Sequence, residues 1–125
     1  MKGSFTTLPI VKDTQEGRVR KADWGGLTVV LGEAHVELDR TPMFKGLPDD
    51  RCQCPHWGYV IKGSITYKFA SHDEIYNAGD VFYAPPGHTL IFGRGAVYVE
   101  FSPTDELQKT LEAIARNSTA LANNR

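Results

Sequence analysis

The middle of this 125-residue chain is a series of short runs of β-forming residues, each ended by glycine, proline, asparagine, aspartate or serine. The runs are Leu27–Leu31, Ala34–Leu38, Trp57–Ile61, Ser64–Phe69, Val81–Ala84, Thr89–Phe92 and Ala96–Phe101. Closely spaced short strands with such punctuation are typical of an all-β sandwich or barrel. Gly63 joins two of the runs, and we expect a hairpin there.

The C-terminal segment changes to a helical period. Leu107, Leu111 and Ile114 recur at i, i+4 and i+7, which places them on one helical face. Ser102 offers an N-cap and Pro103 a first helical residue. We therefore predict a helix over about 103–117, packed on the barrel or on a partner subunit, after a barrel core over about 27–101. A chain of this length predicts a single domain over 1–125.

Composition excludes several classes of partner. The chain has 14 basic and 15 acidic residues and a net charge of −1, which gives no electrostatic case for nucleic acid or a membrane surface. Residues 1–20 contain no apolar stretch typical of a secretion signal, and no run approaches a membrane span. Two cysteines are too few for a disulfide scaffold. We expect a soluble, cytoplasmic protein with free thiols.

Two segments carry residues suited to chemistry. Cys52, Cys54 and His56 alternate before one β run, and His88 directly follows the turn Pro85-Pro86-Gly87. On an extended strand the first three side chains share a face, and His88 on a neighbouring strand could approach His56. Thiolate and imidazole together suit zinc or iron better than magnesium or calcium. The alternative is that these residues are buried polar members of a β core, because cysteine packs as a small hydrophobe.

The two segments also resemble the motifs of the cupin family. Cupins carry His-x-His, three or four residues, Glu, six residues and Gly, followed later by Gly, five residues, Pro-x-Gly, two residues and His. The residues from Gly79 to Gly87 fit the second motif, but Leu90 takes its histidine position and His88 stands two residues earlier. Counting back from Gly63 puts His56 at the Glu position and Cys52 at a histidine position.

This resemblance implies a double-stranded β-helix (jelly-roll) barrel of the kind found in small single-domain cupins of unknown function. It implies a metal held by Cys52, His56 and His88, with Cys54 as the alternative thiol. Zinc or iron is favoured over copper or nickel. Cupins are commonly dimeric, and a homodimer formed through the N-terminal strand or the C-terminal helix would cover an open sheet edge.

Aromatic side chains on the predicted strands are a second feature that bears on function. Half of those on the strands must point inward by alternation, which predicts a largely apolar cavity with a few polar groups. The candidate lining residues are Tyr59, Tyr67, Tyr83, Tyr98 and Glu100. The sequence thus predicts a barrel that binds a small organic molecule, as a metal-dependent enzyme or, alternatively, as a metal-free, non-catalytic metabolite-binding or sensing protein.

Overall fold

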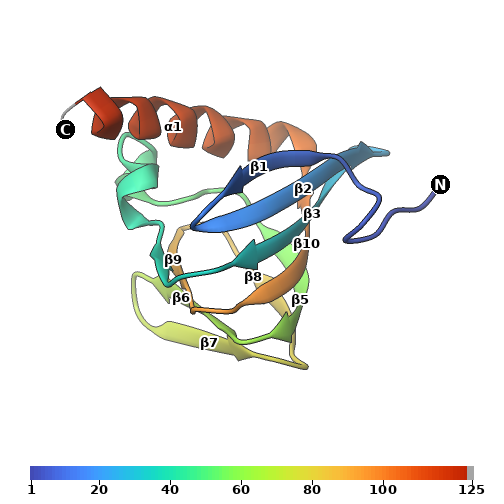
Figure 1. Ribbon diagram of the computed structural model, residues 1–125. Helices are drawn as coiled ribbons and strands as arrows, with labels where there is room; N and C mark the ends of the chain where they lie inside the picture. The colour runs from blue at the N-terminus through green and yellow to red at the C-terminus, as the bar shows by residue number, and fades with distance from the viewer. Residues whose placement is uncertain (124–125) are drawn as a thin grey trace.

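The computed structural model describes residues 1–123, which form two antiparallel sheets and a C-terminal helix (Figure 1). The strands are β1 (Ile10–Thr14), β2 (Gly17–Trp24), β3 (Leu27–Ala34), β4 (Leu38–Asp39), β5 (His56–Lys62), β6 (Ser64–Phe69), β7 (Asp73–Asn77), β8 (Val81–Ala84), β9 (His88–Phe92) and β10 (Val97–Pro103). One sheet has the order β1-β2-β3-β10-β5-β8 and the other β4-β9-β6-β7. The predicted jelly-roll barrel with a C-terminal helix is confirmed.

Alternation along the strands decides which side chains enter the barrel. In β8, Phe82 and Ala84 are buried while Val81 and Tyr83 are exposed. In β5, His56 and Val60 are buried, and the residues between them at odd positions face outward. Each strand therefore has an apolar inner face, and the inner faces of the two sheets pack together.

The expected hairpin at Gly63 is wrong. β5 pairs with β10 and β8, whereas β6 pairs with β7 and β9, so the chain crosses from one sheet to the other at this residue. Gly63 has a φ of +70°, in the left-handed region, and a Cβ here would lie 2.9 Å from the Ala96 backbone. Glycine is required because the crossing is both sharply turned and tightly packed.

Other element boundaries also differ from the predictions. The hairpin of β1 and β2 extends the six-stranded sheet before the expected start of the barrel at 27, and Ala34–Leu38 is not a strand, since β3 ends at Ala34. The segment 39–51 begins with the last residue of β4 and contains two short 3-10 helices, η1 (Thr41–Phe44) and η2 (Pro48–Asp50).

The helix α1 (Thr104–Asn123) is longer than expected and closes one side of the barrel. It packs against η1, β10 and β3 (Figure 1). The Asn117 side-chain amide donates hydrogen bonds to the carbonyls of Met43 (2.7 Å) and Lys45 (2.9 Å). These bonds fix the helix to η1 at the point where the apolar stripe ends, which explains why the helix continues. This α1 is not long and apolar enough to cross a membrane.

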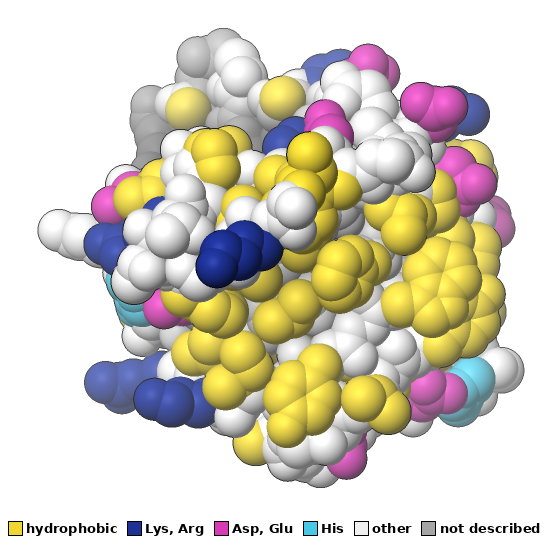
Figure 2. Space-filling view, turned by 90° about the vertical axis from the view of Figure 1, so that its right-hand side faces the viewer, with side chains coloured by type: hydrophobic (Ala, Val, Ile, Leu, Met, Phe, Trp, Pro, Cys, Tyr) yellow, Lys and Arg dark blue, Asp and Glu magenta, His cyan; other side chains and the backbone are white. Residues whose placement is uncertain are grey.

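The outer face of the six-stranded sheet is apolar. Figure 2 shows hydrophobic side chains gathered on the side of the molecule where β5 and β10 lie in Figure 1. Exposed apolar residues on these strands and on β8 are Trp57, Tyr59, Ile61, Val81, Tyr83 and Phe101. Trp57 and Tyr83 form a cross-strand pair with stacked rings 5.1 Å apart.

Candidate metal centre and cavity

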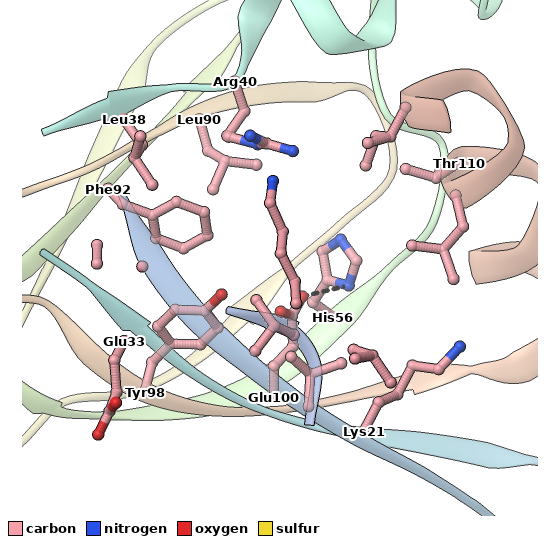
Figure 3. A pocket seen from close by; sticks show the side chains of 18 of the residues that line it. Lys21, Glu33, Leu38, Arg40, His56, Leu90, Phe92, Tyr98, Glu100 and Thr110 are labelled. Carbon is pink, nitrogen blue, oxygen red and sulfur yellow. Dashed lines mark ion pairs between the residues drawn. The ribbon is translucent and has the colours of Figure 1, made fainter. Parts of the chain in front are cut away.

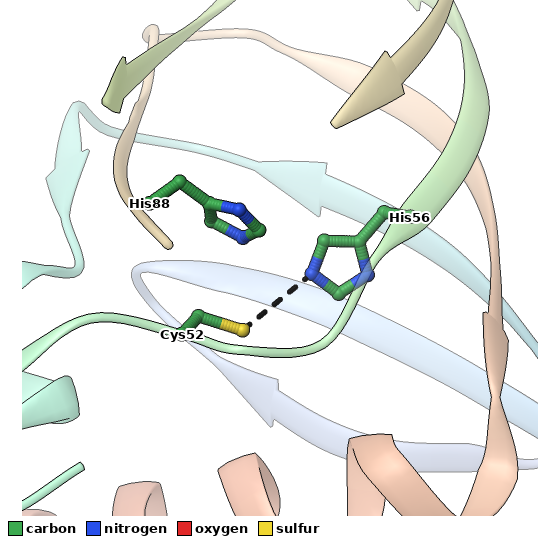
Figure 4. Close-up of side chains that lie close together, drawn as sticks. All are labelled: Cys52, His56 and His88. Carbon is green, nitrogen blue, oxygen red and sulfur yellow. Dashed lines mark hydrogen bonds between the residues drawn. The ribbon is translucent and has the colours of Figure 1, made fainter. Parts of the chain in front are cut away.

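An isolated bridge between two backbone segments brings Cys52 opposite His88. The Cys52 N–H donates to the His88 carbonyl (2.8 Å), and the His88 N–H donates to the Cys52 carbonyl (3.2 Å). His56 lies four residues after Cys52, at the start of β5. The sulfur and ring nitrogens of Cys52, His56 and His88 lie within 4.8 Å of one another, and all three residues are buried (Figure 4).

The protonation of His56 follows from its partners. Its Nδ1 lies 2.6 Å from Glu100 Oε1 and 2.7 Å from Ser102 Oγ, both on β10. A carboxylate can only accept, so Nδ1 carries a proton. The other nitrogen, Nε2, lies 3.7 Å from the Cys52 sulfur. Glu100 therefore fixes the ring so that Nε2 faces the thiol, an arrangement typical of metal-binding histidines.

His88 is held in the same way by a different acceptor. Its Nδ1 donates to the Pro85 carbonyl at 2.8 Å, across the turn that the sequence marks with two prolines and a glycine. Its Nε2 is buried and has no hydrogen-bond partner within residues 1–123. Buried polar atoms are rarely left unpaired, so an unpaired ring nitrogen facing a thiol and a second imidazole indicates room for a ligand.

The local charges favour a thiolate at Cys52. Burial raises the pKa of this thiol, but the neighbouring imidazoles of His56 and His88 stabilise the thiolate, outweigh burial and bring the pKa to about 6. Burial also acts on the neighbouring pair, lowering the pKa of His56 and raising that of Glu100. The attraction between the two opposes this, so the His56 pKa lies well above its usual value and the Glu100 pKa below its own.

The donor set fits a metal such as zinc. Zn–S bonds of about 2.3 Å and Zn–N bonds of about 2.0 Å at a tetrahedral angle place sulfur and nitrogen about 3.5 Å apart. The separation of Cys52 Sγ and His56 Nε2 is 3.7 Å. Cys54 lies outside this group: it is buried, its sulfur contacts the Pro55 carbonyl (3.4 Å), and burial raises the pKa of its thiol.

A cavity of about 380 Å³ opens beside the centre (Figure 3). Its wall includes Cys52 and His56, the predicted residues Tyr67, Tyr98 and Glu100, and apolar side chains of both sheets and of α1. Tyr59 and Tyr83, expected as lining residues, lie instead on the outer face, 42% and 49% exposed. Their odd positions in β5 and β8 give them the parity of outward-facing residues.

Arg40 and Thr110 are among the polar cavity residues that were not anticipated from the sequence. Arg40 follows β4 and directs its guanidinium into the cavity (Figure 3). Thr110 on α1 is buried, and its hydroxyl lies 3.3 Å from the Cys52 sulfur. Thr110 had a signal, because it interrupts the apolar stripe Leu107, Leu111 and Ile114 at the i+3 position. Arg40 had none, since the segment around it has no regular period.

Comparison with known proteins identifies the architecture. No protein-family model and no curated protein sequence matches the chain. Among solved structures, an RmlC-like cupin from Shewanella frigidimarina superposes with a TM-score of 0.55 at 17% identity, over 81% of this chain and 88% of that one. The apo form of HppE superposes with a TM-score of 0.53 at 12% identity, over 82% of this chain and 57% of that one.

A third solved structure is similar over nearly its whole length. The protein VPA0057 of Vibrio parahaemolyticus, of unknown function, gives a TM-score of 0.52 at 15% identity, over 77% of this chain and 97% of that one. These likenesses establish the fold. The chain is a cupin-fold protein, as its motifs predicted.

Proposed function

We propose that this protein binds a divalent transition metal through Cys52, His56 and His88, and binds a small organic molecule beside the metal in the barrel cavity. The observation that supports this is the convergence of two imidazole Nε2 atoms and one thiol sulfur, with both Nδ1 atoms held by acceptors. Zinc or iron suits this donor set best, ahead of copper or nickel.

The proposed activity is that of a metal-dependent enzyme acting on a small molecule. Three protein ligands leave an open coordination position, as catalytic metal sites require, and a metal bound there would supply Lewis-acid polarisation of a substrate oxygen. Within the chain, Glu100 holds the proton on His56 Nδ1, and the Pro85 carbonyl does the same for His88. Thr110 and the apolar residues of α1 line the cavity beside the centre.

The second candidate is a metal-free, non-catalytic barrel that binds or senses a metabolite. One observation favours it: a Cys52 thiolate beside a protonated His56 would be a self-contained ion pair. His88 argues for the metal instead, because such a pair leaves its buried Nε2 without a partner.

Metal analysis separates the two candidates. We expect the untagged protein to contain one equivalent of metal by inductively coupled plasma mass spectrometry, and His56→Ala and His88→Ala to lose it. The matched control is His72→Ala, since His72 is exposed and pairs with Glu74 at 2.9 Å. Metal-free wild-type protein that also fails to take up added zinc or ferrous iron would eliminate the metal proposal.

We also propose a cytoplasmic location and a homodimer. Cys52 and Cys54 are both free thiols, which fits a reducing compartment. The edge strand β1 is exposed throughout, including Ile10 and Val11, and pairing with a second copy would cover it.

A further inference from the structure

The guanidinium of Arg40 is one of several charged groups in the cavity wall that the proposed metal centre does not use; the others are Lys12, Glu16, Arg18, Lys21 and Glu33. The Arg40 side chain projects into the cavity past Leu90 (Figure 3). No ion pair or side-chain hydrogen bond to this guanidinium occurs within residues 1–123. Burial lowers the pKa of Arg40, although arginine remains charged at neutral pH. The attraction of Glu16, which also lines the cavity, opposes this shift but forms no ion pair, so the guanidinium is open to a ligand anion.

The backbone holds Arg40 firmly in this position. Its N–H donates to the Leu90 carbonyl at 2.9 Å, and its own carbonyl accepts from the Met43 N–H at 2.9 Å in η1. The side chain thus starts from a fixed point on the cavity wall. Lys12, Arg18 and Lys21 also line the cavity, from β1 and β2. Lys12 is exposed, Arg18 pairs with Asp13 at 3.3 Å, and Lys21 is partly buried, as Arg40 is. Arg40 is therefore a cation placed to bind a ligand inside the barrel.

The surroundings of Arg40 define the chemistry of that ligand. Tyr98 is buried, and its hydroxyl points into the same space (Figure 3). Stacking on Phe92, with ring centroids 4.8 Å apart, fixes the Tyr98 ring. Apolar side chains complete the wall, among them Leu38, Leu90, Phe92, Leu107 and Ile114. A guanidinium fork and a hydroxyl that line one cavity match a carboxylate, and the apolar wall matches a hydrocarbon body.

From this arrangement we infer that the cavity binds a small monocarboxylate, with its carboxylate on Arg40 and Tyr98, its apolar body against the cavity wall and its other end facing Cys52 and His56. The position of the end of the ligand near Cys52 and His56 rests on the proposed function. The position of its carboxylate rests on Arg40. The volume of about 380 Å³ lies at the small end of ligand pockets, which limits the ligand to a compact molecule.

Isothermal titration with 3-phenylpropanoate and its neutral amide, 3-phenylpropanamide, tests the inference. We expect the acid to bind the zinc-supplemented protein at least tenfold more tightly than the amide. Arg40→Met should remove that preference while keeping the fold, which thermal unfolding checks, and Arg40→Lys should retain part of it. The matched control is Arg94→Met, because Arg94 is exposed. Equal binding of acid and amide, an unchanged preference in Arg40→Met, or no binding of the acid to folded protein would each overturn the inference.

Zinc content measured on the same samples separates this inference from the proposed function. One equivalent of zinc without selective acid binding would remove the carboxylate site and leave the metal proposal standing. Selective, Arg40-dependent binding of the acid by protein that takes up no zinc would remove the metal proposal and leave the carboxylate site standing.

Discussion

Glu100 is the residue through which the metal proposal can be tested without removing a ligand. The substitution Glu100→Gln keeps the shape of the side chain and an oxygen acceptor for His56 Nδ1, now 2.6 Å away, but removes the negative charge. A hydrogen bond to a charged group contributes about 1.5–3 kcal/mol, and one between neutral groups about 0.5–1.5 kcal/mol. The difference, about 1–1.5 kcal/mol, corresponds to a loss of roughly tenfold in metal affinity.

The assay is a competition titration of the metal-free protein with zinc against a chromophoric chelator. We expect a loss of about tenfold for Glu100→Gln, in line with the range of about 10–100-fold typical of groups that hold metal-binding histidines. Ser102→Ala should lose less, because the Ser102 hydroxyl that also contacts Nδ1 at 2.7 Å is uncharged.

The chain contains a matched control for this substitution. Glu74 contacts His72 at 2.9 Å, but both side chains are about half exposed. Glu74→Gln should leave zinc affinity unchanged within twofold. The reasoning would be refuted if Glu100→Gln bound zinc as tightly as the wild type, or if both substitutions weakened zinc binding equally.

Three further predictions concern the thiol, the cavity wall and assembly. In metal-free protein, the ultraviolet absorbance of the Cys52 thiolate should appear with a midpoint near pH 6, and it should vanish in Cys52→Ser but not in Cys54→Ser. Because this folded-state pKa lies below the usual 9.0, ionisation of Cys52 should add stability as the pH rises from 6 to 9. A midpoint above pH 8 would contradict the prediction. A methyl at Gly32 would overlap the Tyr98 ring, so Gly32→Ala should lower stability by about 1–3 kcal/mol in urea denaturation, and an equal cost in a Tyr98→Leu background would contradict the overlap. Light scattering should give twice the chain mass of 13.9 kDa, and a monomer at micromolar concentration would count against the dimer.

The sequence predicted the barrel because strand signals are local. Val81–Ala84 and Ser64–Phe69 were predicted with the boundaries that the structure has, since each lies between turn residues and contains β-branched or aromatic side chains. Pairing is not local, and this is why the Gly63 hairpin was wrong. A glycine between two strands fits a hairpin and a crossing between sheets equally well; packing against Ala96 decides which one forms.

The site was predictable only in part for a related reason. His56 and His88 were recognised by residue type and position, but residue spacing does not predict their orientation. His56 is oriented by Glu100, which is distant in the sequence, and His88 by the backbone carbonyl of Pro85, which is close in the sequence but positioned by the conformation of the turn. Tyr59 was misplaced although its parity with outward-facing Trp57 was available from the sequence. Arg40 could not be found, because its position depends on the loop conformation of 39–51.

Charge balance connects the metal centre with the carboxylate site. A divalent metal on the Cys52 thiolate, beside the Glu100 carboxylate, would leave the inner end of the cavity without net charge, and the Arg40 guanidinium would keep a positive charge that no ion pair within residues 1–123 matches. A monocarboxylate would neutralise that charge, whereas a neutral amide would leave it against apolar side chains. Glu100→Gln adds a further positive charge to the same interior. It should therefore strengthen the binding of 3-phenylpropanoate to zinc-saturated protein while it weakens zinc binding, and two effects of the same sign would show that the sites are not coupled by charge.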